Sequence, residues 1–198
     1  MGAKPRPITV AWLKRHRACS DGIERFRKLF GESAAPTAEN LERCNEDDAE
    51  WFIGARDLSV VLRRNGKRYH YLRGELRRDN GPAIEWDGGG NCYYKNGLLH
   101  RDDGPALEYA NGTKKYYQHG ELHRDNGPAI EWANGDRYYL QRGKLHRDNG
   151  PAIKYDNGTK YYYQHDRLHR DNGPAIEYAN GAKCYYQHGK LIRRTVTR

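Results

Sequence analysis

The chain has 198 residues, of which 36% are hydrophobic and 31% charged, and its formal net charge is +9. Its 16 Tyr and 22 Gly argue against a disordered chain, because disordered segments are poor in aromatic residues. No apolar run approaches the roughly 18 residues that a membrane-spanning helix needs, and no signal-peptide apolar region follows the basic N-terminus. We therefore expect a soluble, cytoplasmic protein without a membrane span.

The first 58 residues predict three or four short helices in one domain. One helix is predicted over residues 8–17. A second follows Asp21-x-x-Glu24, which has the spacing of a capping box, and ends at Gly31. Thr37 is predicted to cap a third helix. Because so short a segment has a marginal core by itself, we expect a helical cap over the first hairpin; a separate partner-binding domain is the alternative.

A 23-residue repeat occupies the remainder of the chain, residues 59–198. The triplet Gly-Pro-Ala recurs at constant spacing, and half-units before the first copy and after the last bring the total to about five and a half units. Turn pairs separate short β-prone segments that lack a helical period. The sequence therefore predicts a mainly β protein, an extended antiparallel β-hairpin array with a small α-helical N-terminal cap. The triplets begin at Gly81, Gly104, Gly127, Gly150 and Gly173.

Asn-Gly pairs are the strongest short-range hairpin signal, because a type I′ turn needs positive φ at both central residues. In the third unit, a two-residue turn at residues 134–135 would place Trp132 opposite Arg137. A second two-residue turn, at residues 142–143, continues the pairing and places Leu140 opposite Leu145. Cross-strand partners share a face of the sheet. The expected face therefore carries Ile130, Trp132, Arg137, Tyr139 and His146.

The unit G-x-L-H-R-x-x-G-P-A followed by N-G resembles the MORN-repeat class over about residues 60–198. Residues 116–120, Tyr-Tyr-Gln-His-Gly, replace the usual Y-x-G-x-W opening, and residues 123–128 replace the usual H-G-x-G. The resemblance implies a meandering single sheet used for protein or membrane association rather than catalysis. A short helical domain ahead of such repeats also resembles phage and mobile-element proteins. That resemblance implies an inhibitor of a host defence system, such as an anti-CRISPR.

All 16 Tyr lie in the repeat region, and most units carry two in succession. Successive side chains of a strand face opposite sides, so both tyrosine ladders cannot be buried in a one-layer sheet. An exposed ladder offers the rigid, amphipathic contact area that is enriched at interfaces. The candidate binding residues are this ladder with neighbouring cations and histidines: Tyr116, Tyr139, Tyr162, Tyr185, Trp132, Arg137, Lys160, His123, His146 and His169.

Positive charge gathers at the two ends of the array. Residues 79–182 hold 13 basic and 15 acidic residues, so the central repeats lack the basic stripe that is typical of nucleic-acid binding. The C-terminal cations are explained as charges that discourage edge-to-edge pairing of sheets. The candidate anion-binding site is the cluster ahead of the central repeats, formed by Arg63, Arg64, Lys67 and Arg68.

The tripeptide His-Arg-Asp recurs in four units and matches the start of a kinase catalytic loop, but no phosphate-binding loop or metal-binding triplet accompanies it. Equivalent histidines of adjacent units would lie roughly 9–10 Å apart, too far to share a zinc ion. The four Cys form no C-x-x-C pair. We expect no catalytic residue, no metal site and no cofactor.

These observations favour a non-enzymatic binding module that engages a protein partner along its repeat sheet. One alternative is a nucleic-acid-binding protein that uses the basic ends and a tyrosine ladder, and its affinity would fall steeply with salt. The other alternative is a structural or assembly scaffold. An enzyme is disfavoured, because no nucleophile, base and oxyanion set converges in the sequence.

Overall fold

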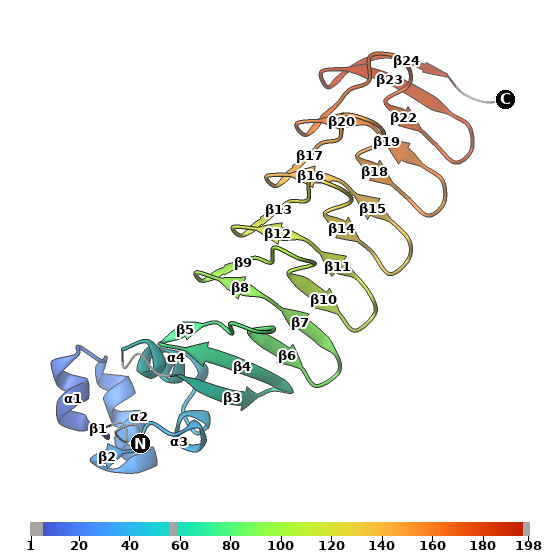
Figure 1. Cartoon of the computed structure of the whole chain (residues 1–198). Helices are drawn as coiled ribbons and strands as arrows, with labels where there is room; N and C mark the ends of the chain where they lie inside the picture. The colour runs from blue at the N-terminus through green and yellow to red at the C-terminus, as the bar shows by residue number, and fades with distance from the viewer. Residues whose placement is uncertain (1–5, 56–58, 196–198) are drawn as a thin grey trace. The chain divides into compact units, whose positions relative to one another are not determined.

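The computed structural model describes residues 6–55 and 59–195. The chain divides into two compact units, Met1–Gly88 and Gly89–Arg198 (Figure 1). Among the described residues, four short helices lie in the first unit, and antiparallel hairpins make up most of the remainder. The expected fold class, a mainly β hairpin array with a small helical N-terminal segment, is confirmed. The predicted domain boundary follows residue 58, and residues 56–58 lie outside the described residues.

Local capping contacts set the ends of the helices. The hydroxyl of Thr9 accepts a hydrogen bond from the Trp12 N–H at 3.0 Å, and that of Thr37 accepts one from the Asn40 N–H at 3.3 Å. Gly31, with φ of 72°, ends the second helix as predicted. The helices are α1 (Val10–Arg15), α2 (Ser20–Phe30), α3 (Ala38–Glu42) and α4 (Glu46–Ala55), and strand β1 (Ile8–Thr9) pairs with β2 (Ser33–Ala34).

The predicted capping box at Asp21 and Glu24 is wrong. Cys19 is the N-cap of α2, and its Sγ accepts a hydrogen bond from the Gly22 N–H at 3.3 Å. Because cysteine sulfur is a weak hydrogen-bond acceptor, the sequence pattern indicated the aspartate as the capping residue instead. None of the helices in the described part of the chain combines the length and the apolar character needed to cross a membrane.

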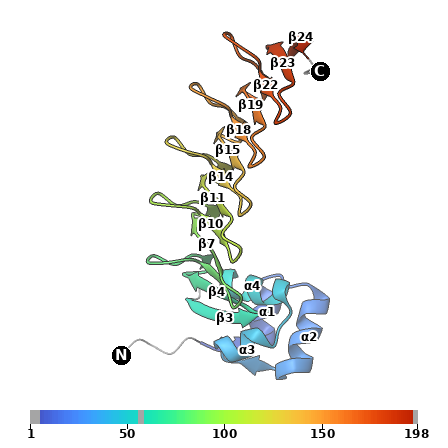
Figure 2. The ribbon, with the colours of Figure 1, turned by 90° about the vertical axis from the view of Figure 1, so that its right-hand side faces the viewer.

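The helices of the first unit share one core with its first hairpin (Figure 2). Leu13 and Ile53 from the helices are fully buried in this core, and Leu62 and Tyr71 of the hairpin are also buried in it. The hairpin thus completes a core that the short helices could not build alone. The strands of this unit beyond β2 are β3 (Val60–Arg64), β4 (Lys67–Leu72), β5 (Glu75–Leu76) and β6 (Ile84–Trp86).

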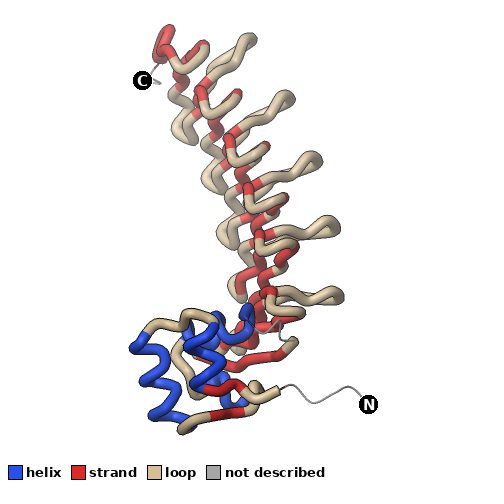
Figure 3. The backbone as a smooth tube through the Cα atoms, turned by 90° about the vertical axis from the view of Figure 1, so that its left-hand side faces the viewer, coloured by secondary structure: helices blue, strands red, loops and turns tan. Residues whose placement is uncertain are grey.

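The second unit repeats its hairpins every 23 residues along one antiparallel sheet. The sheet order is β7, β10, β11, β14, β15, β18, β19, β22, β23, β24, and smaller two-stranded hairpins lie beside it (Figure 1). No helix occurs within residues 59–195, as predicted (Figure 3). The sheet strands are β7 (Gly90–Cys92), β10 (Leu107–Tyr109), β11 (Lys114–Lys115), β14 (Ile130–Glu131), β15 (Arg137–Tyr138), β18 (Ile153–Lys154), β19 (Lys160–Tyr161), β22 (Ile176–Glu177), β23 (Lys183–Gln187) and β24 (Lys190–Thr195).

The small hairpins carry the second turn of each unit, and this turn is the type I′ turn. Arg142 and Gly143 both have positive φ, 50° and 74°, and Leu140 pairs with Leu145 as predicted. The small hairpins are β8 (Tyr94–Lys95) with β9 (Leu98–Leu99), β12 (Tyr117–Gln118) with β13 (Glu121–Leu122), β16 (Leu140–Gln141) with β17 (Lys144–Leu145), and β20 (Tyr163–Gln164) with β21 (Arg167–Leu168).

The Asn-Gly turns differ from the predicted type I′ geometry. In the third unit only Gly135 of the pair has positive φ, 101°. The Trp132 N–H donates to the Asp136 carbonyl and the Gly135 N–H donates to the Trp132 carbonyl, both at 3.0 Å. The Asn134 side-chain oxygen accepts a hydrogen bond from the Asp136 N–H at 3.1 Å. These contacts make a type I turn followed by a glycine bulge, which the asparagine side chain supports.

The bulge shifts the strand register by one residue relative to the prediction. Ile130 pairs with Tyr138 rather than Tyr139, and Arg137 pairs with Glu131 rather than Trp132. A shift of one residue exchanges the two faces of a strand. The predicted face is therefore wrong for Ile130 and Trp132, which lie on the side opposite Tyr139.

The Ile130 side of the sheet is the thin core of the array. Ala129 and Ile130 are buried with Leu140, and Tyr138 and Leu145 pack against them. The alanines of the Gly-Pro-Ala corners in this unit have no exposed surface, so each corner closes against the sheet without room for a larger side chain. These alanines are Ala106, Ala129, Ala152 and Ala175.

Thiol reactivity is expected to follow burial. Cys19 is exposed, whereas Cys44, Cys92 and Cys184 are buried, and burial raises the pKa of Cys44 to about 11. At pH 8 a chromogenic disulfide reagent should titrate one thiol per native chain rapidly and four in denaturant. Four rapidly reacting thiols in the native protein would contradict the packing described above.

Candidate binding surface

Each repeat of the second unit places an arginine over a tyrosine ring, on the face opposite Ile130. Where the second 23-residue repeat joins the third, the guanidinium carbon of Arg124 lies 3.7 Å from the centre of the Tyr116 ring. Nη1 of Arg124 also donates to the Pro128 carbonyl at 3.2 Å, so the proline corner holds the guanidinium in place. Such cation–π contacts contribute about 0.5–2 kcal/mol. The equivalent pairs, at 3.7–3.9 Å, are Arg101–Tyr93, Arg147–Tyr139, Arg170–Tyr162 and Arg193–Tyr185.

The repeated histidines join neighbouring units. Nδ1 of His123 accepts a hydrogen bond from the Arg142 N–H of the next small hairpin at 3.1 Å. Its Nε2 lies 3.1 Å from the Asp125 carboxylate, so the ring proton is on Nε2 and is donated to that aspartate. The same double contact recurs in the neighbouring units, with His100, His146 and His169. Hydrogen bonds from His100, the largest cause, and from Lys95 hold the pKa of Asp102 below its usual range.

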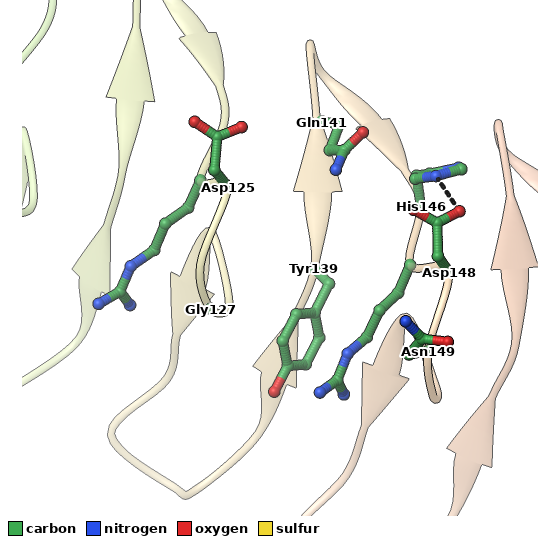
Figure 4. Close-up of a pocket in the computed structure, with 9 residues that line it drawn as sticks. Asp125, Gly127, Tyr139, Gln141, His146, Asp148 and Asn149 are labelled. Carbon is green, nitrogen blue, oxygen red and sulfur yellow. Dashed lines mark hydrogen bonds and ion pairs between the residues drawn. The ribbon is translucent and has the colours of Figure 1, made fainter.

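Open polar grooves recur between successive corners. One is lined by Tyr139, Gln141, His146 and Asp148 of one repeat and by Asp125 of the preceding repeat (Figure 4). Its volume is about 300 Å³, and equivalent grooves around Tyr116 and Tyr162 have volumes of about 380 and 340 Å³. Each groove has an Arg-stacked tyrosine on its wall and carboxylate and amide groups at its rim. The surface thus offers the same set of contacts at regular intervals.

A row of charges crosses the same face of the sheet. Corner arginines pair with glutamates of the sheet: Arg124 with Glu131 at 2.7 Å and Arg170 with Glu177 at 2.6 Å. The glutamates in turn lie opposite basic residues on neighbouring strands, a favourable arrangement. Burial, the larger cause, and the Glu131 charge raise the pKa of Tyr116 in this setting. The cross-strand pairs are Glu108–Lys114, Lys114–Glu131, Glu131–Arg137, Lys160–Glu177 and Glu177–Lys183.

Aromatic rings also form a chain on the opposite, Ile130 side. Trp132 contacts Tyr138 edge to face with ring centres 6.3 Å apart, and Tyr138 contacts Tyr155 in the same way at 6.0 Å. Tyr155 and Tyr178 both contact Tyr161 in the next step. Burial, the larger cause, and a hydrogen bond with Tyr155 raise the pKa of Tyr138. These rings pack over the thin core; the tyrosines are half-buried, whereas Trp132 is exposed.

The candidate binding residues therefore separate into two groups. Tyr116, Tyr139 and Tyr162 each line a groove together with His123, His146 and His169, respectively. Arg137 and Lys160 lie in the charge row of the same face, and Tyr185 is stacked under Arg193. Trp132 is the exception, because the register shift moves it to the other face, where Lys115 lies over its ring at 5.2 Å.

The four candidate anion-binding residues each contact other groups of the first unit. Arg64 donates to the carbonyl groups of Leu41, Glu42 and Cys44 and so satisfies the C-terminal end of α3. The other three contacts are Arg68 with Glu85 at 3.6 Å, Lys67 over the Trp86 ring at 5.8 Å, and the Arg63 N–H with the Glu42 carboxylate.

Sequence reasoning missed the corner residues that build the grooves. Arg124, Arg147 and Arg170 belong to the recurring His-Arg-Asp tripeptide and are not among the predicted binding residues, although each stacks on a tyrosine of the candidate ladder. The signal was present in the repeat itself. Each arginine lies eight residues after its tyrosine, across the type I′ turn, and a turn of fixed length brings such pairs together.

Fold and surface together define a β-hairpin repeat protein with a helical N-terminal segment. Neither a scan of the sequence against protein-family models nor a search of curated proteins finds a match. The MORN-like pattern therefore remains a resemblance in the repeat motif.

Proposed function

We propose that this protein is a non-enzymatic binding module that holds an extended segment of a protein partner along its row of grooves. The observation that carries the proposal is the recurrence of one polar groove, with one Arg-stacked tyrosine, in three successive repeats. Tyrosine and arginine are among the side chains most enriched at binding hot spots.

The spacing of the grooves fits an extended polypeptide. Successive units are two strands apart, which is about 9.4–9.8 Å. Three residues of a polyproline II helix, which has three residues per turn, span about 9.3 Å. A segment lying along the array would therefore present one side chain to each groove at every third residue. An interface of this kind gains affinity from repetition, with modest contributions from each groove.

The charges of the surface favour a protein over a nucleic acid. Asp125 and Asp148 lie at the rim of the central groove, and Glu131 and Glu177 lie in the charge row beside it. A phosphate backbone would meet these carboxylates at every repeat. Nucleic-acid surfaces instead present cations along the whole track.

Two substitutions in the middle of the array test the proposal. The partner is first captured from source cells with the tagged full chain, with and without nuclease, and then purified. We expect Tyr139→Ala combined with Tyr162→Ala to weaken partner binding at least tenfold, because both substitutions remove groove walls. Trp132→Ala is the matched control, since it removes an exposed ring from the other face and should leave the affinity unchanged.

A thermal melt accompanies the binding measurement. Loss of binding with a melting temperature close to that of the unmodified chain supports the groove surface. Unchanged binding by the folded double variant, or binding lost only in Trp132→Ala, would overturn it. Capture that disappears after nuclease treatment would favour the nucleic-acid alternative.

A further inference from the structure

The row of charged residues on this face departs from its repeating pattern at one position, Lys154 in the fourth 23-residue repeat. The first, second, third and fifth units place Glu85, Glu108, Glu131 and Glu177 at this repeat position. Lys154 is exposed and lies on strand β18. Within residues 59–195, it is the single position of this series that reverses the charge.

The corner arginine of that unit consequently lacks its carboxylate. Arg78, Arg101, Arg124 and Arg170 lie 2.6–3.9 Å from the glutamate of their own unit. Arg147 has the same stacking on a tyrosine, at 3.7 Å, and the same bond to a proline carbonyl, at 3.3 Å. No carboxylate of the described residues pairs with Arg147 or with Lys154. The Arg147 guanidinium is thus held as in the other repeats, but no glutamate of the described residues lies beside it.

The strand neighbours of Lys154 add further positive charge. Lys154 pairs with Arg137 on one side and with Lys160 on the other. Like charges directly opposite one another on adjacent strands destabilise a sheet. A glutamate at this position could form ion pairs with Arg137, Arg147 and Lys160. The lysine therefore makes the folded array less stable than a glutamate would. A site kept at a cost to folding points to a function outside the fold.

We infer that Arg137, Arg147, Lys154 and Lys160, the Lys154 cluster, bind a carboxylate that the partner supplies. The inference rests on the proposed function and names the chemistry that the partner brings. The internal glutamates show that an arginine in this geometry donates to a carboxylate, and an aspartate or glutamate of the partner takes their place in the fourth repeat. Arg147 also lines the central groove, so the groove adjoins this cluster. An acidic residue in the middle of the bound segment would therefore contact the cluster.

The same geometry disfavours a nucleic-acid phosphate at this cluster. Glu131 lies next to Arg137 across the strands, and Glu177 lies next to Lys160. The positive region is therefore bounded on both sides by carboxylates. A carboxylate on a flexible side chain can lie between them while neighbouring carboxylates point away, whereas the successive charges fixed along a phosphate backbone would be repelled.

The test restores the repeat pattern with Lys154→Glu in the full chain. Lys144→Glu is the matched control, because Lys144 is an exposed lysine of a neighbouring small hairpin and the change in charge is identical. Binding is measured by NMR titration at low salt with three probes. The probes are acetylated tetraglutamate amide, acetylated tetraglutamine amide and a twelve-nucleotide oligothymidylate. The blocked ends of the peptides separate side-chain carboxylates from a chain terminus.

We expect Lys154→Glu to raise the melting temperature while lowering tetraglutamate affinity at least tenfold, with less than a twofold change for Lys144→Glu. Lys154→Gln, which removes the charge without adding a new pair, should show an intermediate loss of affinity. A more stable Lys154→Glu chain that binds tetraglutamate as well as the unmodified chain would overturn the inference. Tighter binding of oligothymidylate than of tetraglutamate would also overturn it.

The purified partner distinguishes this inference from the proposed function. Partner binding that survives Lys154→Glu but is lost in the double tyrosine variant would reject the carboxylate site and retain the groove surface. Partner binding that survives both changes would reject both. Loss in both variants, with the fold intact, supports the acidic contact within the groove.

Discussion

Ile153→Ala is expected to lower the free energy of unfolding of the second unit by about 2–5 kcal/mol. Ile153 is buried in the middle of the sheet, where it pairs with Tyr138 on one neighbouring strand and with Tyr161 on the other. The thin core has no second layer that could move into the cavity, so the loss should fall near the upper part of this range. Chemical denaturation of the full chain, followed by circular dichroism, measures it.

Ile192→Ala is the matched control, because Ile192 is 61% exposed and lies near the end of the array. Its expected effect is within about 0.5 kcal/mol. Repeat arrays are held together by contacts between neighbouring units, so a central defect also divides the array into two shorter halves. Equal effects of the two substitutions would contradict the assignment of the Ile130 side as the core.

Gly127→Val should destabilise the array through its backbone conformation. The φ of Gly127 is 139°, which is strained for any residue with a Cβ atom, and a Cβ there would lie 3.1 Å from the Arg124 guanidinium carbon. The strained conformation alone costs about 1–3 kcal/mol. Displacement of the guanidinium from the Tyr116 ring adds to this cost, because it breaks a contact at 3.7 Å.

Gly104→Val isolates the contribution of the backbone. Gly104 occupies the same repeat position, and a Cβ there would lie 3.2 Å from the Arg101 guanidinium carbon, but its φ is outside the strained range. The two variants therefore share the steric contact and differ in conformation. Melting temperatures that are equal for both would show that the corner glycines are required for space alone.

Much of this architecture could be predicted because the repeat supplies its own consistency check. The constant 23-residue period excluded insertions, and the Asn-Gly and second turns divided each period into short strands. Thr37 and Gly31 set helix ends through local contacts that depend only on nearby residues. Features of this kind need no knowledge of the tertiary structure.

The faces of the sheet were harder to predict, because Asn-Gly is compatible with two turns that differ by one residue. The hydrogen bond from the Asp136 N–H to the Asn134 side chain selects the bulged turn. The charge pattern contained the missing information. In the observed register Glu131 lies opposite Arg137, whereas the predicted register opposed Arg137 to Trp132. Complementary charges across the strands therefore identify the register better than the turn residues do.

The Lys154 cluster could not be recognised from the sequence for the same reason. The charge environment of one lysine among many charged residues cannot be inferred until its neighbours on adjacent strands are known. Those neighbours follow from the strand register. The tyrosine ladder, in contrast, was visible as a simple recurrence. Sequence reasoning thus located the aromatic part of the candidate surface and missed its electrostatic part.

The hydrogen bonds by which each repeated histidine joins its repeat to the next affect how the number of repeats can evolve. Each tie joins one unit only to the next, so a complete unit can be duplicated or deleted in frame and the new neighbours find the same donor and acceptor. Each event would alter the length of the array by two strand spacings, about 9.4–9.8 Å, and would add or remove one groove. Duplication within the gene would therefore change the length of the array in fixed steps of one repeat. Under the function proposed above, chains with different numbers of repeats would select partner segments of different lengths.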